Sequence, residues 1–155
     1  NLVCWGGRGL VRSWNGKTDE ANLPDFYEFA VGDNNPVMKW DHDSYQPHAI
    51  IVAIGTNDFS SGIPDRDTYI STYIKLIQKL RRNHPQAEIL LIDGSILNGD
   101  NKKTLVTYLA DVVKKSNNPK LVLWGEIFLK TKNGNPSDHF KIDLKNNIID
   151  NLSVK

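Results

Sequence analysis

Hydrophobic positions along this chain fall into two alternating patterns: short unbroken apolar runs, and stretches with an apolar residue every three or four positions. Unbroken runs are typical of strands buried in a parallel sheet, and the second spacing is typical of amphipathic helices. The expected strands are Leu2–Trp5, Ala49–Ile54, Glu88–Ile92 and Leu121–Trp124, and the expected helices are Asp67–Arg82, Thr104–Lys115 and a last one from Asp138 onward. This alternation predicts an α/β fold, a three-layer sandwich around a parallel sheet with right-handed crossovers.

The long segment over residues 6–47 is rich in Gly, Asn, Asp and Pro but also carries many aromatic residues. The aromatics argue against disorder, so we expect an ordered excursion with at most one short helix near Pro24–Ala30. No repeat or linker divides the sequence, and we expect a single domain over residues 1–155.

Charge and composition exclude several classes of function. The 19 Lys and Arg residues nearly balance the 18 Asp and Glu residues and are spread along the chain, which leaves no basic face for nucleic acid or a membrane. No window approaches the ~18 apolar residues of a membrane span. No metal site is expected, because Asp41-His42-Asp43 is a lone polar triplet, and no cofactor is expected either.

Polar residues follow the second apolar run at once, in the order Gly55-Thr56-Asn57-Asp58. Ligands bind at the carboxyl ends of strands in open α/β sheets, and an amide NH2 there could donate a hydrogen bond to an oxyanion. The same residues are also common turn formers. The cluster Gly6–Gly9 follows the first run and would let backbone N–H groups approach a ligand, but it lacks the Gly-Lys-Ser/Thr of a phosphate-binding loop.

A third loop, Asn135–His139, precedes the last expected helix. A histidine in the first turn of a helix would have its pKa lowered by the helix dipole, which would leave His139 neutral and able to accept a proton. Taken alone, a histidine in this position is more often a surface or capping residue.

Together and in this order, the motifs resemble the SGNH (GDSL-like) hydrolase superfamily, and within it carbohydrate esterase family two, the acetylxylan-esterase-like enzymes. The segments that carry the resemblance are Trp5–Trp14, Leu23–Tyr27, Lys39–Asp41, Gln46–His48, Gly55–Phe59 and Pro85–Ile89. The resemblance implies a serine esterase that acts on a polysaccharide or a small acyl ester. It implies that the Gly7 N–H and the Asn57 amide hold the oxyanion and that His139 activates the serine.

The resemblance also implies a shallow cleft for a sugar, with Trp14, Trp40 and Tyr45 as stacking surfaces. The same rings could instead cover one face of the sheet. We expect a secreted or extracellular protein, in which Asn151-Leu152-Ser153 would be a glycosylation acceptor.

One departure from the family concerns the nucleophile. The family's Gly-Asp-Ser block lies before the first segment that matches here, so the resemblance leads us to expect that the first, central strand of the fold and its serine lie outside these 155 residues. Unpaired strand groups cost roughly 1–3 kcal/mol each, so we expect a second polypeptide or a cleaved N-terminal segment beside Leu2–Trp5 and Ala49–Ile54. Alternatively, these two strands close up and pair directly.

A second departure concerns the histidine block. Asn135 stands where the family usually has a histidine before proline, which favours a catalytically inactive subunit with a structural or carbohydrate-binding role. Ser95 could replace the missing serine, but its place in the chain corresponds to a later strand and a turn serine fits better.

Overall fold

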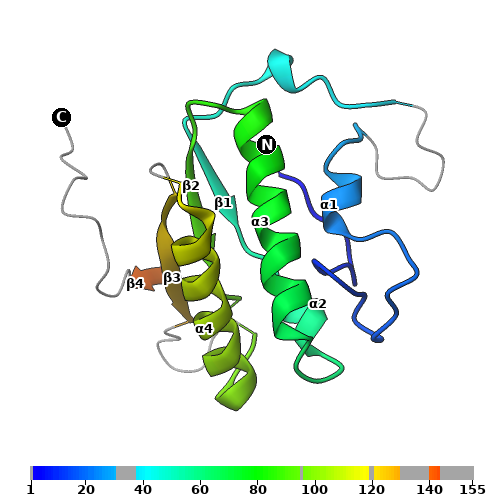
Figure 1. Cartoon of the computed structure of the whole chain (residues 1–155), viewed down its shortest axis with the longest axis vertical. Helices are drawn as coiled ribbons and strands as arrows, with labels where there is room; N and C mark the ends of the chain where they lie inside the picture. The colour runs from blue at the N-terminus through cyan, green and yellow to red at the C-terminus, as the bar shows by residue number, and fades with distance from the viewer. Residues whose placement is uncertain (1, 31–37, 95, 119–120, 130–139, 144–155) are drawn as a thin grey trace.

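The structure, a computed structural model, describes residues 2–30, 38–94, 96–118, 121–129 and 140–143. Its sheet has four strands in the order β1-β2-β3-β4 (Figure 1). These are β1 (Ala49–Val52), β2 (Glu88–Ile92), β3 (Leu121–Leu129) and β4 (Phe140–Asp143). The first three run parallel, whereas β4 is antiparallel to β3. The α/β class with a parallel sheet is therefore confirmed.

Two long helices, α3 (Arg66–Asn83) and α4 (Gly99–Ser116), lie side by side along one face of the sheet (Figure 1). The Asp65 carboxylate caps α3 by accepting the Thr68 N–H at 2.9 Å. The helix ends at His84, where the following Pro85 cannot continue it. The described residues also contain three shorter helical segments: α1 (Leu23–Phe26), the 3₁₀ turn η1 (His42–Ser44) and α2 (Thr56–Phe59).

The core lies between these two helices and the sheet. Its fully buried side chains include Tyr69, Tyr73 and Ile77 of α3, Leu105, Leu109 and Val112 of α4, and Ile89 and Leu91 of β2. Burial of one such apolar side chain stabilises a fold by about 1.5–3 kcal/mol. Among the described residues, no helix combines the length and the apolar character that crossing a bilayer requires.

The strand expected over Leu2–Trp5 does not form. Leu2–Trp5 belongs to no strand, its four side chains are exposed, and no backbone hydrogen bond joins residues 2–4 to another described residue. The proposed direct pairing of Leu2–Trp5 with the Ala49 strand is also not seen, because β1 pairs only with β2. An apolar segment becomes a strand only when a neighbour accepts and donates its hydrogen bonds, and this segment has none among the described residues.

Several other elements differ from the sequence prediction. β1 ends at Val52 instead of Ile54, and β3 extends to Leu129 instead of Trp124. The helix expected from Thr104 begins at Gly99. The prediction missed this start because the first turn is polar and lacks the apolar spacing on which the prediction relied. The segment Phe140–Asp143 was expected in a helix but forms β4, and its apolar residues alternate with polar ones, as in a strand. The rest of that expected helix, which would form the third layer, lies outside the described residues.

Candidate active site

The loop after β1 turns sharply into α2 at Gly55. This glycine has φ +143°, and a Cβ there would lie 2.8 Å from the Tyr69 hydroxyl oxygen. The Tyr69 O–H donates a hydrogen bond to the Ile54 carbonyl at 3.1 Å, from within the core. Burial raises the pKa of Tyr69 well above its ordinary value, so the hydroxyl keeps its proton. The end of β1 is therefore fixed, and Asn57 leaves it in a defined direction.

Asn57 meets the glycine loop, although Leu2–Trp5, which leads into that loop, belongs to no strand. Its Nδ2 donates a hydrogen bond to the Arg8 carbonyl at 2.8 Å. The neighbouring Gly7 has φ +75°, a backbone conformation that favours glycine, and its N–H donates to no other described residue. An amide NH2 has two hydrogens, so Asn57 retains one donor beside the free Gly7 N–H.

Asp58, the residue after Asn57, also binds this loop. Its fully buried carboxylate accepts backbone N–H groups from Leu10, Val11 and Arg12. Burial raises the pKa of Asp58, and the three N–H donors oppose that rise by stabilising the carboxylate. The sequence analysis treated Asp58 only as a turn former, and nothing in the pattern indicated which loop its carboxylate would meet.

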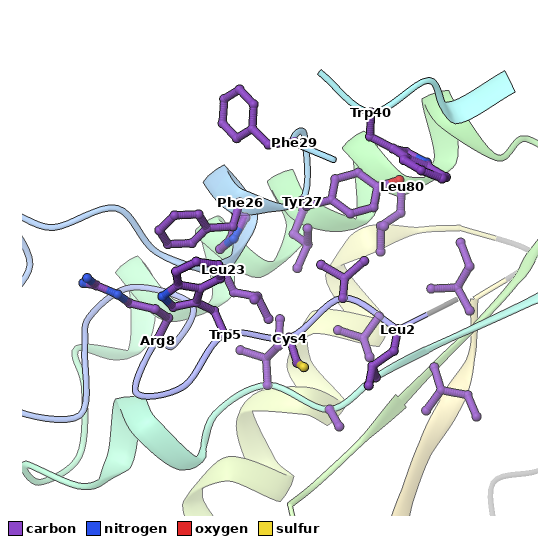
Figure 2. Close-up of a pocket in the computed structure, with 18 of the residues that line it drawn as sticks. Leu2, Cys4, Trp5, Arg8, Leu23, Phe26, Tyr27, Phe29, Trp40 and Leu80 are labelled. Atoms are coloured by element: carbon purple, nitrogen blue, oxygen red, sulfur yellow. The ribbon is translucent and has the colours of Figure 1, made fainter. Parts of the chain in front are cut away.

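The Arg8 side chain braces the loop on its other side. It forms an ion pair with Glu20, and its guanidinium donates to the Ser13 hydroxyl at 3.0 Å. A hydrogen bond from Ser13 and the nearby Arg8 charge lower the pKa of Glu20. Trp5 stacks on Phe26 with ring centroids 4.8 Å apart, close to the same guanidinium (Figure 2).

The three predicted sugar-stacking residues occupy different places. Trp14 lies against the glycine loop: its backbone N–H donates to the Gly7 carbonyl at 2.9 Å, and 61% of the residue is exposed. Trp40 donates its backbone N–H to Glu28, which is paired with Lys79 in the last turns of α3. Tyr45 precedes the amino end of β1. The structure therefore places Trp14 against Gly7. Trp40 and Tyr45 line a groove that also reaches Asn57.

An apolar groove of about 700 Å³ runs along the free edge of β1. One wall is β1 and its following loop to Asn57, and the opposite wall is the extended segment Leu2–Trp5 (Figure 2). Leu76 and Leu80 of α3 line it as well. The groove therefore separates two extended segments that both lead into the loops carrying Gly7 and Asn57.

His42 also lines the groove that reaches Asn57. Neither ring nitrogen of His42 has a hydrogen-bond partner among the described residues, although both atoms are buried. The nearest carboxylate oxygen, Oε2 of Glu28, is 3.9 Å from Nε2. The ring stacks on Tyr27 and meets His84 edge-on. Buried polar atoms are normally paired, so the two ring nitrogens of His42 lack the polar partners that such atoms usually have, as far as the described residues show.

Three other residues of interest, His139, Asn135 and Ser95, lie outside the described residues. Within the described part of the chain, no group of three or more His, Cys, Asp or Glu side chains could hold a metal ion.

A family profile described as the GDSL-like Lipase/Acylhydrolase family matches residues 6–127, which include the glycine loop, the Asn57 loop, β1, β2 and most of β3. The chain belongs to this family. It is similar to carbohydrate esterases: it is 64% identical over 110 residues to an acetylxylan esterase / glucomannan deacetylase from Cellvibrio japonicus, a match over 71% of this chain and 31% of the relative. It is 30% identical over 117 residues to the cellulase/esterase CelE of Acetivibrio thermocellus, over 76% of this chain and 14% of the relative.

The chain is also similar to solved structures of carbohydrate esterases. The chain superposes with a TM-score of 0.79 and 56% identity on a family two carbohydrate esterase from Cellvibrio japonicus, over 82% of this chain and 38% of that one. A family two carbohydrate esterase from Clostridium thermocellum, solved in complex with cellohexaose, gives a TM-score of 0.71 at 28% identity, over 79% of this chain and 37% of that one. The chain thus spans about 31% of the first curated relative's length and 38% of the first solved chain.

Proposed function

We propose that this chain is part of a carboxylester hydrolase that removes acetyl groups from a polysaccharide. The observation that carries the proposal is the meeting of Asn57 with the glycine loop at the carboxyl end of β1, where two N–H donors are left free. Two such donors suit the oxyanion of an acyl-transfer intermediate. The similarity to acetylxylan esterases, and to an esterase solved with cellohexaose, supports the substrate class.

In the proposed reaction a serine Oγ attacks the acetyl carbonyl carbon while His139 takes the serine proton. Negative charge that develops on the carbonyl oxygen is stabilised by the Gly7 N–H and the Asn57 amide. The sugar oxygen then leaves with the proton held by His139, and the acetyl group remains on the serine. A water molecule then attacks the acetyl carbon while His139 takes its proton. Acetate leaves, and the proton returns to the serine oxygen.

We propose further that the serine arrives on a strand from a second polypeptide or from a cleaved N-terminal segment, which lies in the groove. The free edge of β1 would supply its ladder hydrogen bonds, and the apolar lining from Leu76 and Leu80 would cover its side chains. A backbone group at one end of the inserted strand could also partner His42, whose ring nitrogens have none among the described residues. The strand's carboxyl end would then carry the serine to the edge where Asn57 lies.

Trp14 is the aromatic residue best placed to stack on the sugar that carries the acetyl group. Its exposed ring lies against Gly7, within reach of any substrate bound to the oxyanion donors. Trp40 and Tyr45 would contact substrate only if it extended toward the amino end of β1.

The test uses the complete native assembly, isolated without denaturation, and measures acetate release from acetylated xylan and from 4-nitrophenyl acetate. We expect release from both, and a large loss of it in His139→Ala. Activity that is indifferent to His139→Ala would remove this residue from the mechanism. Native mass spectrometry should detect a companion strand; an active species with the mass of this chain alone would refute the inserted strand.

A second candidate function is an inactive subunit that binds carbohydrate or has a structural role. The observation in its favour is Asn135, which replaces a histidine that the family usually has. An assembly that binds cellohexaose in calorimetry but releases no acetate from either substrate would support this alternative.

A further inference from the structure

The Asp58 carboxylate collects backbone donors from three consecutive residues of the loop after the glycine cluster. Oδ1 accepts from the N–H groups of Leu10 at 3.0 Å, Val11 at 2.8 Å and Arg12 at 3.3 Å, and Oδ2 accepts from Leu10 at 2.8 Å. The residue is fully buried, and its carboxylate makes these contacts across 46 to 48 positions of sequence. Hydrogen bonds to a charged acceptor are worth about 1.5–3 kcal/mol each, so this is a strong tie.

The loop closes around the carboxylate from the other side. The Arg12 side chain donates from Nε to the Asp58 carbonyl at 2.7 Å, so the two residues are joined in both directions. A Cβ at Gly9 would collide with the Asp58 carboxylate and would lie 2.5 Å from the Arg12 carbonyl oxygen. Only glycine at position 9 allows this closeness.

Asp58 and Asn57 are adjacent residues of α2 and hold adjacent parts of the same loop. Asn57 holds the Arg8 carbonyl, and Asp58 holds the three N–H groups that follow. Because Gly7 is the residue before Arg8, any slide of the loop on α2 would change the separation between the Gly7 N–H and the Asn57 amide. A shift of about 1 Å in such a site can reduce a rate by up to about 10²-fold.

We propose that Asp58 is a positioning residue, which locks residues 8–12 onto α2 so that the Gly7 N–H and the Asn57 amide face one oxyanion. This inference rests on the proposed esterase function. Asp58 itself touches no substrate: its carboxylate is enclosed by the loop, and it acts through the backbone.

The isosteric variant Asp58→Asn probes this role directly. An Asn side chain keeps one acceptor oxygen, but its NH2 at the Oδ2 position would face the Leu10 N–H, a donor against a donor. Gly9→Ala disturbs the same contact from the opposite side without changing any charge. Asp93→Asn is the matched control, because Asp93 is equally buried and directly follows β2, but pairs with Lys102 of α4 at 3.2 Å instead of the loop.

Two measurements on the complete native assembly decide the matter. We expect Asp58→Asn and Gly9→Ala to lower kcat for acetate release by up to about 10²-fold with little change in KM, since the donors act in the transition state. We also expect faster amide hydrogen exchange at Leu10, Val11 and Arg12 in both. Asp93→Asn should lose stability yet keep kcat per folded molecule and the exchange rates of these three amides.

The possible failures are distinguishable. An active wild-type assembly in which Asp58→Asn changes neither kcat nor the three exchange rates would overturn the positioning role and leave the esterase intact. Equal kcat losses in Asp58→Asn and Asp93→Asn would reduce Asp58 to a structural residue. An inactive wild-type assembly would overturn the esterase proposal, while the exchange rates would still show whether Asp58 holds the loop.

Discussion

Replacement of Asn57 by alanine separates the structural hydrogen bond of this amide from its proposed role as an oxyanion donor. One hydrogen of Nδ2 bonds the Arg8 carbonyl at 2.8 Å, and the other is free for an oxyanion. Loss of an ordinary hydrogen bond costs about 0.5–1.5 kcal/mol of stability. Loss of an oxyanion donor raises the barrier by about 2.7–4 kcal/mol, which lowers kcat by about 10²–10³-fold. We therefore expect Asn57→Ala to lose far more activity than its small loss of stability explains.

Asn101→Ala is the matched control for this prediction. The Asn101 Nδ2 also donates to a backbone carbonyl of α2, that of Phe59, at 3.3 Å. Urea unfolding should give similar losses of stability for the two variants, whereas steady-state acetate release should fall only in Asn57→Ala. If both variants kept the wild-type kcat, or if both lost it equally, the assignment of Asn57 as an oxyanion donor would be refuted.

Three further predictions concern single side chains. Tyr69→Phe removes the donor to the Ile54 carbonyl and should lower the free energy of unfolding in a urea titration by about 1–3 kcal/mol. Tyr73→Phe should be neutral or stabilising in the same titration, because the buried Tyr73 hydroxyl has no partner among the described residues. Burial, together with the nearby His42, lowers the pKa of His84 below 6.5, so the unfolded chain binds the proton more readily; stability should fall as pH drops from above 6.5 toward the folded-state pKa, and His84→Gln should flatten that part of the profile. Trp14→Ala should raise KM for acetylated xylan more than for 4-nitrophenyl acetate in steady-state assays, and equal increases would argue against sugar stacking.

The sequence was most informative where one physical rule decided the outcome. Ligands bind at the carboxyl ends of strands in open α/β sheets, so the loop after β1 was expected to carry a site residue, and Asn57 of that loop contacts the Arg8 carbonyl of the glycine loop. The spacing of apolar residues likewise located α3 to within a residue at each end, since Pro85 stops it and Asp65 caps it.

Predictions failed where the outcome depended on a distant partner. Leu2–Trp5 has the composition of a strand, but a strand also needs a neighbour, which local sequence does not reveal. The aromatic residues of the long excursion could not be placed without the path of the backbone, which puts Trp14 against Gly7 and puts Trp40 and Tyr45 along the groove. Their stacking on a sugar stays a prediction. Asp58 appeared to be an ordinary turn residue, because its role depends on contacts nearly fifty positions away along the chain.

The edge of β1 away from β2, which has no partner strand among the described residues, has a practical consequence for recombinant production of this chain. An unprotected strand edge beside apolar side chains is a template on which other strands, including those of identical molecules, can add. Expressed alone at high concentration, the polypeptide should therefore form oligomers or inclusion bodies. Co-expression with a polypeptide that covers this edge should raise the soluble yield.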